Sequence, residues 1–154
     1  MKIKKGKLDI ILNILCLILL TGTSVFLVVY WNDIPNQVPL HYDFAGKVNR
    51  IGSKNEYIVV VAIGWIIYIL MTVIERFPGI WNTGIEVTEE NREKVYATLL
   101  HFISSLKFII ICIFTYLTIK GIFSLQLSAW FTPIYLLLIF GDMGYWVFRL
   151  LKLR

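Results

Sequence analysis

The chain has 154 residues, of which 58% are hydrophobic and 16% charged, and its net charge is +5. The mean hydropathy of +0.74 excludes an ordinary soluble domain, in which about a quarter of the residues are charged. The basic residues lie mostly at the ends of apolar runs rather than on one face, which excludes a nucleic-acid-binding protein. Composition therefore predicts an integral membrane protein whose main partner is the lipid bilayer.

Four apolar runs are long enough to cross a bilayer, which takes about 20 helical residues. We expect spans at residues 9–31, 57–74, 96–119 and 125–148. The first run follows a basic start but exceeds the ~7–15 apolar residues of a signal peptide, so we expect it to be retained. Backbone groups in lipid need internal hydrogen bonds, so each run should be a helix. We predict an all-α fold, in which the whole chain forms one four-helix membrane domain.

The segments between the runs differ in their content of basic residues. Most lysines and arginines outside the runs lie near the two termini or in residues 75–95. Basic residues favour the cytoplasmic side of a membrane. We therefore expect both termini and residues 75–95 in the cytoplasm, residues 32–56 outside, and the protein in the cell membrane.

Residues 32–56 are polar, yet their composition indicates a defined conformation rather than a slack linker. Pro35 and Pro39 each fix a φ angle, and Gly46 and Gly52 allow tight turns. We expect a structured loop that folds back over the mouth of the helix bundle.

This loop carries a motif, PLHYDxxGxxNRxGSK from Pro39 to Lys54. The motif resembles the signature of a bacterial membrane domain of unknown function, found at the N-terminus of SdpI-type immunity proteins against a sporulation-delaying toxin. The resemblance implies a cell-envelope protein with an immunity or stress-response role. Its partner would be a peptide, a toxin (an antimicrobial peptide) or another membrane protein. The candidate ligand-binding residues are His41, Asp43, Gly46, Asn49, Ser53 and Lys54.

Two roles are open for His41, which either binds a ligand or hydrogen-bonds within the loop and holds its shape. A zinc site on His41 and Asp43 would need at least a third protein ligand. Asp33 or Glu56 could supply it, but nothing in the spacing requires this. No nucleophile, phosphate-loop or metalloprotease motif is present. We therefore predict no enzyme, no metal and no cofactor.

Lys107 and Asp142 are the charged residues deepest in the expected helices. Each would cost at least ~2.5–3.5 kcal/mol if it were unpaired in the bilayer. We expect them to form an internal polar pair that is either structural or part of an ion path, unless both side chains snorkel to the interface. The alternative function is accordingly a small transporter or ion-handling bundle.

Overall fold

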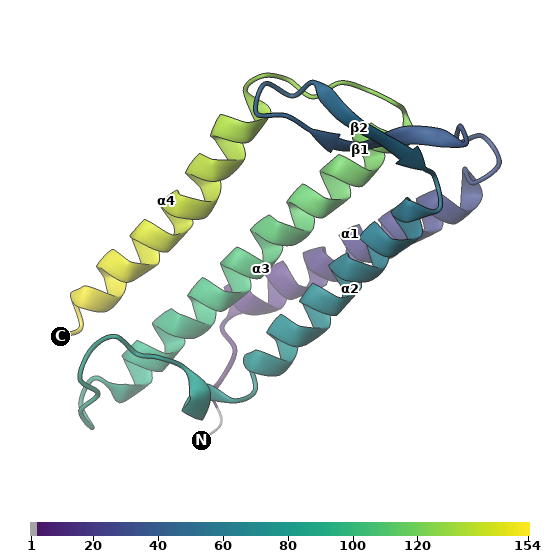
Figure 1. Cartoon of the computed structure of the whole chain (residues 1–154). Coiled ribbons are helices and arrows are strands. Elements are labelled where there is room, and N and C mark those ends of the chain that lie inside the picture. Colours follow the sequence, from purple (N-terminus) through teal and green to yellow (C-terminus); the bar gives the residue numbers. More distant parts are fainter. Residues whose placement is uncertain (1–2) are drawn as a thin grey trace.

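The computed structural model describes residues 3–154, which form four long helices and one small sheet (Figure 1). The helices are α1 (Lys7–Val29), α2 (Glu56–Ile74), α3 (Arg92–Ile122) and α4 (Phe131–Leu151). The strands are β1 (Gln37–Tyr42) and β2 (Val48–Ser53), and one turn of 3-10 helix, η1 (Pro78–Ile80), follows α2. All four helices are long and apolar enough to cross a membrane. This confirms the predicted number of spans.

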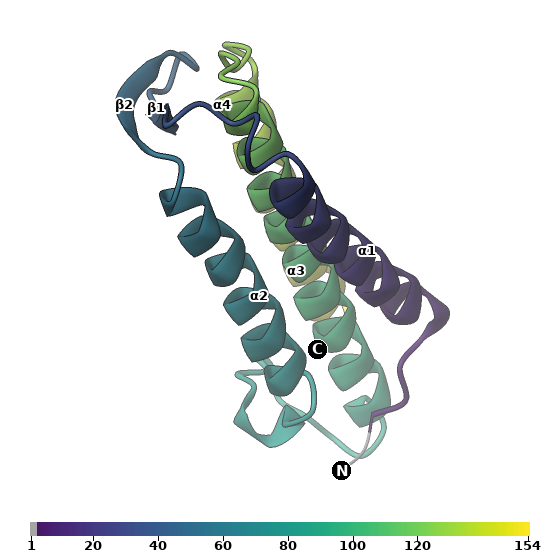
Figure 2. The ribbon, with the colours of Figure 1, turned by 90° about the vertical axis from the view of Figure 1, so that its right-hand side faces the viewer.

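The four helices do not form a closed bundle. α3 is central, with α1 and α2 packed on it and on each other, and α4 packed on α3 (Figures 1 and 2). Within residues 3–154, α4 makes at most minor contacts with the other two helices, and Leu150 is its one buried residue. Three helices therefore share an interior, and the fourth lies along the outer side of α3.

The connection between α1 and α2 contains the antiparallel strands β1 and β2, so the all-α prediction is wrong for this segment. Val38 pairs with Gly52 and Tyr42 pairs with Val48, with register shifts on either side of His41. The strands lie beyond the helix ends (Figure 1). Their unpaired edges therefore need not face lipid, where an open strand would be unstable.

The largest difference from the expected boundaries is at α4, which begins at Phe131 rather than at residue 125. Ser124 has a φ of 54°, which takes the chain out of the helix. Leu127 is buried, and its N–H donates to the carbonyl oxygen of Gly46 at 3.1 Å. This apolar stretch therefore packs against the hairpin instead of extending α4.

The start of α1 and the end of α4 lie at the same end of the molecule, as four crossings require (Figure 1). We call this the terminal end. The opposite end, which carries β1 and β2, is the hairpin end.

Candidate functional site

The hairpin is held to the helices by a buried apolar cluster. Its members come from α1, β1, α2 and α3 and from the turn before β1: Leu27, Ile34, Val38, Tyr57 and Ile122. The hydroxyl of Tyr57 also donates to the carbonyl oxygen of Pro39 at 2.5 Å. The hydroxyl of Tyr42 donates to the carbonyl oxygen of Leu125 at 3.2 Å. Because these contacts reach three helices and the α3–α4 connection, the hairpin has a defined position over the helix ends.

Several residues of the loop motif form hydrogen bonds that shape the hairpin. His41 Nδ1 and Asn49 Oδ1 are 2.6 Å apart, so the structure brings these two predicted site residues together. The Asp43 carboxylate accepts from the N–H of Lys47 at 2.9 Å and closes the turn between the strands. The shape-holding contact expected for His41 is therefore present, and ligand binding by this residue stays a prediction.

The remaining motif residues support the backbone. Lys54 Nζ donates to the carbonyl oxygens of Trp31 at 2.9 Å and Ile34 at 3.2 Å, which joins the end of β2 to the end of α1. Ser53 Oγ accepts from the N–H of Asn55 at 3.3 Å. Gly46 has a φ of +80°, and a Cβ atom there would lie 2.6 Å from the carbonyl oxygen of Leu127. Only glycine fits this position without a shift.

A cavity of about 390 Å³ lies under the hairpin, between α2, α3 and α4. One wall comes from the motif, through His41, Tyr42 and Asp43. Burial raises the pKa of the Tyr42 hydroxyl above its ordinary value, and the neighbouring Tyr116 adds to this. The rest of the lining is mainly apolar and aromatic and includes Tyr57, Val60, Phe114, Leu117, Phe131 and Tyr135. The cavity thus combines a polar rim with an apolar interior.

A second cavity, of about 290 Å³, lies between α3 and α4. It shares Phe131 and Tyr135 with the first. Its other lining residues are almost all apolar: Phe108, Ile109, Cys112, Ile113, Tyr116, Ile134 and Leu138. The two cavities together extend an apolar surface from the hairpin down the α3–α4 seam.

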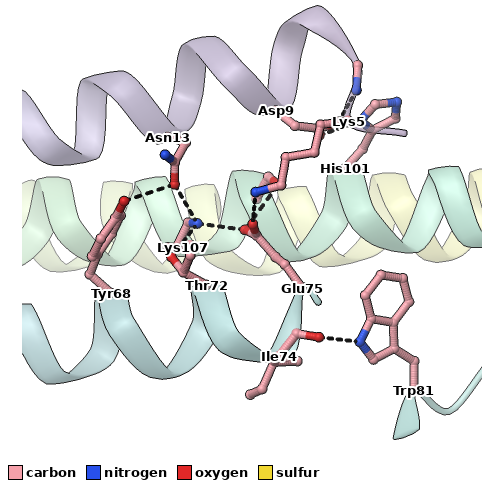
Figure 3. Close-up of polar contacts among 12 residues, drawn as sticks. Lys5, Asp9, Asn13, Tyr68, Thr72, Ile74, Glu75, Trp81, His101 and Lys107 are labelled. Carbon is pink, nitrogen blue, oxygen red and sulfur yellow. Dashed lines mark hydrogen bonds and ion pairs between the residues drawn. The ribbon is translucent and has the colours of Figure 1, made fainter. Parts of the chain in front are cut away.

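The second candidate site is a charged cluster in the interior shared by α1, α2 and α3 (Figure 3). The side chain of Lys107 is fully buried, and its Nζ lies 2.6 Å from Glu75 Oε1. The same nitrogen donates to Asn13 Oδ1 and to Thr72 Oγ1, each at 3.1 Å. A lysine ammonium has three donors, so each has an acceptor here. The centroid of the Tyr68 ring lies 5.1 Å from Lys107 Nζ.

Glu75 is bonded from several sides. Its second oxygen accepts from Lys5 Nζ at 2.6 Å, and its side chain is also fully buried. Ser104 Oγ donates to Oε1 at 3.3 Å. Trp81 Nε1 donates to the carbonyl oxygen of Ile74 at 2.9 Å and fixes the chain next to Glu75 (Figure 3). One carboxylate therefore lies between two lysines, one from the segment before α1 and one from the middle of α3.

A contact between a buried carboxylate and an imidazole lies near this cluster, towards the terminal end (Figure 3). Asp9 Oδ1 is 2.6 Å from His101 Nδ1, and the Asp9 side chain is fully buried. Its other oxygen accepts from the N–H of Gly6 at 2.8 Å, as an acidic residue in the first turn of a helix does. Asp9 thus fixes the start of α1 against α3.

The predicted pair between Lys107 and Asp142 is corrected by the structure, which gives the two residues different partners. Lys107 faces α1 and α2, where Glu75 lies. Asp142 accepts from Ser105 Oγ and from Trp146 Nε1, each at 3.0 Å. Ser105 and Lys107 are two residues apart on α3 and so point in different directions. α4, which carries Asp142, therefore cannot supply the partner of Lys107.

The buried carboxylates of Asp9 and Glu75 are not among the predicted site residues. The predicted boundaries place Glu75 in the connection after the second helix. A signal for its role was nevertheless present, because its spacing from Tyr68 and Thr72 continues one polar helix face.

Comparison with known proteins identifies part of the chain. Residues 17–71 match the family described as "Domain of unknown function (DUF1648)". No curated protein and no solved structure matches the chain. The matched segment runs from α1 through β1 and β2 into α2, so it contains the loop motif and one wall of the cavity under the hairpin. Residues 17–71 thus match a domain family of unknown function, in agreement with the resemblance that the loop motif carries.

Proposed function

We propose that this multi-pass membrane protein binds a membrane-active peptide at its hairpin end, in an SdpI-like immunity or stress-response role in the bacterial cell envelope. The observation that carries the proposal is the cavity of about 390 Å³ whose wall contains His41 and Asp43 of the motif. This volume is within the ~300–1,000 Å³ range of ligand pockets. The role is one of binding, without a catalytic step.

The composition of the cavity supports an amphipathic ligand. Its ionisable hairpin residues His41 and Asp43 lie on one wall, whereas Phe114, Leu117 and Phe131 make much of the helix-lined wall apolar. A peptide that is active in membranes carries apolar side chains that could enter this space while its backbone stays near the hairpin. The neighbouring α3–α4 cavity, through Tyr135, would allow a longer apolar group to extend along the seam.

The proposal includes an orientation in which the hairpin end is outside and both termini are in the cytoplasm. Two of the basic residues at the hairpin end are engaged within the protein. Arg50 is paired with Glu56 at 2.8 Å, and Lys54 donates to backbone carbonyls. The terminal end also carries more lysines and arginines than the hairpin end, where Lys47, Arg50, Lys54 and Lys120 lie. This excess of basic residues favours the terminal end for the cytoplasmic side.

A growth-protection assay tests the proposal. A sensitive host expresses the wild type, His41→Ala or Thr132→Trp, and its growth is measured against a titration of secreted membrane-active peptides. Thr132 lines the cavity from α4, so a tryptophan there should fill it without removing a hairpin hydrogen bond. Leu137→Trp is the matched control, because Leu137 is on the same helix and 73% exposed. Membrane levels of all variants are compared by immunoblotting.

The proposal expects protection by the wild type and by Leu137→Trp, and loss of protection in the two cavity variants. Protection that survives filling of the cavity would move the binding site elsewhere. A wild type that protects against none of the peptides would contradict the immunity role for those peptides.

A second candidate function is ion handling. The buried Lys107–Glu75 ion pair supports it. Charged residues inside membrane segments often mark ion or proton paths. Ion flux into vesicles containing the wild type, Glu75→Gln or Asp142→Asn tests this function. It requires a flux above that of empty vesicles that falls in Glu75→Gln. A wild-type flux equal to that of empty vesicles would exclude it for the ions tested.

A further inference from the structure

A third cavity, of about 370 Å³, lies at the terminal end between α3 and α4. Its lining includes Lys94 and His101 on α3, Trp146 and Arg149 on α4, and Lys152 directly after α4. Lys94 and His101 are seven residues apart, and Trp146 and Arg149 are three apart, so each pair lies on one face of its helix. Two antiparallel helices thus direct a group of basic side chains into one space.

The cations in this cavity are not neutralised by nearby carboxylates. Within residues 3–154, Lys94, Arg149 and Lys152 form no ion pair, and no acidic residue lines the cavity. Two carboxylates contact lining residues, Asp9 at His101 and Asp142 at Trp146. Neither contacts the lysines or the arginine. Lys152 Nζ lies 4.4 Å from the centroid of the Phe148 ring, a contact that leaves its charge without a counter-ion.

An apolar cavity of about 310 Å³ adjoins the basic one. The two share Thr98 and Trp146. The apolar cavity is lined further by Leu99, Phe102 and Val147. A tryptophan near a helix end is typical of the membrane–water interface, and Trp146 lies where the basic and the apolar spaces meet. The terminal end therefore offers a cationic site beside an apolar one.

We propose that these two cavities bind one anionic phospholipid. Its phosphate lies among Lys94, Arg149 and Lys152, and the first part of an acyl chain lies against Phe102 and Val147. Arginine and lysine pair strongly with phosphate oxygens, and basic pockets between membrane helices bind lipid headgroups. A free phosphate would use only the basic cavity. The proposal concerns a different end of the molecule from the hairpin and does not depend on peptide binding.

Native mass spectrometry of the purified full chain tests the proposal. The protein is mixed with equal amounts of phosphatidylglycerol and phosphatidylcholine of the same acyl chains, and the ratio of the two bound lipids is measured. The test variants are Arg149→Gln with Lys152→Gln, which removes charge, and Val147→Trp, which fills the apolar cavity. The control is Arg76→Gln with Arg154→Gln, which removes the same charge from the terminal end but touches neither cavity.

We expect the wild type to retain phosphatidylglycerol selectively, and the control to do the same. The selectivity should fall about fivefold for each charge lost from the cavity, as expected for a basic side chain at an anionic membrane surface. Val147→Trp should reduce lipid retention without any change in charge. The exchange Arg149→Lys with Lys152→Arg should keep the selectivity, which separates loss of charge from a defect in folding.

Three outcomes would overturn the proposal. One is equal retention of both lipids by the wild type. Another is an equal loss of selectivity in the cavity and control variants, which would show an effect of overall charge. The third is displacement of the bound lipid by millimolar inorganic phosphate, together with normal retention in Val147→Trp. That result would assign the site to a soluble phosphate.

Discussion

Glu75 Oε1 and Lys107 Nζ lie 2.6 Å apart, with both side chains fully buried, and join the end of α2 to the middle of α3. Two charges in this position depend on each other. Replacing a buried ion pair by apolar groups can be neutral, whereas removing one partner leaves an uncompensated buried charge. The stability of the three-helix interior should therefore respond very differently to single and double substitutions.

The first prediction concerns this pair. Glu75→Gln should lower the free energy of unfolding by about 3–5 kcal/mol, because it leaves the buried Lys107 ammonium without its carboxylate. Lys107→Met should lower it less, because Glu75 keeps its contact with Lys5. The double variant should lose clearly less than the sum of the two. Unfolding in mixed micelles, followed by circular dichroism, measures these values.

The control for this prediction is Arg50→Gln, which breaks an ion pair of similar length, 2.8 Å, between side chains that are 63% and 41% exposed. An exposed pair contributes about 0–1 kcal/mol. Additive effects at Glu75 and Lys107, or a loss in Arg50→Gln as large as theirs, would contradict the interpretation of the buried pair.

The second prediction concerns the start of α1. Asp9→Ala should lower the free energy of unfolding by about 1–3 kcal/mol, because the N–H of Gly6 and the ring nitrogen of His101 lose their acceptor. Asp33→Ala is the control, because Asp33 is exposed, whereas Asp9 is buried. Thermal unfolding in detergent compares the two. Similar melting temperatures for both variants would argue against a role of Asp9 in fixing α1.

The third prediction compares two glycines with positive φ. Gly46→Ala places a Cβ atom 2.6 Å from the carbonyl oxygen of Leu127, whereas Gly84→Ala meets nothing within 4 Å. Both variants should lose roughly 1–2 kcal/mol from the unfavourable φ angle. Gly46→Ala should lose more, and the connection between α3 and α4 should become easier to cleave in limited proteolysis. Equal cleavage in the two variants would show that the hairpin does not depend on this close approach.

The fourth prediction concerns alkaline pH. Burial raises the pKa of Tyr42, and its hydroxyl donates to the carbonyl oxygen of Leu125. The folded protein thus holds this proton more tightly than the unfolded chain. The stabilisation by Tyr42 is complete below the ordinary tyrosine pKa of about 10 and is lost as the pH rises through the higher value of the folded state.

Tyr42→Phe should therefore show a smaller loss of stability than the wild type between about pH 9 and 11. Chemical unfolding at several pH values measures this difference. Tyr30→Phe, at an exposed position, is the comparison. If the free energy of unfolding depends on pH in the same way in both variants, Tyr42 is not the source of the loss of stability at alkaline pH.

The sequence predicts the membrane helices well, because hydropathy and length alone decide whether a run can span lipid. It does not predict that α4 begins at Phe131. The residues before Phe131 are apolar enough to be helical. Their position under the hairpin depends on a contact distant in sequence, the hydrogen bond from the N–H of Leu127 to the carbonyl oxygen of Gly46. The pairing of β1 with β2 was missed for a similar reason, since Pro39 and Gly46 predict turns but not a register.

The candidate sites show the same limit. That Lys107 needs a partner follows from the cost of a charge in lipid. Which carboxylate supplies it depends on helix packing, and α2 rather than α4 contributes to the interior that Lys107 faces. The motif from Pro39 to Lys54 coincides with the hairpin, and its role in binding stays a prediction. However, the hydrogen bond between His41 and Asn49 and the cavity beneath them are properties of the folded chain.

The central position of α3 has a consequence for how the protein is made. Asp9 and Glu75 precede α3 in the chain, and their partners His101 and Lys107 both lie on α3. During synthesis, α1 and α2 leave the ribosome before His101 and Lys107 have been made. A charged residue is costly inside lipid, so the carboxylates of Asp9 and Glu75 should stay at the membrane surface or beside the translocation machinery until then. Insertion of α3 brings Lys107 to Glu75, which Lys5 can already reach from the segment before α1, and brings His101 to Asp9. We therefore expect the interior of the first three helices to form when α3 inserts, before α4 is added.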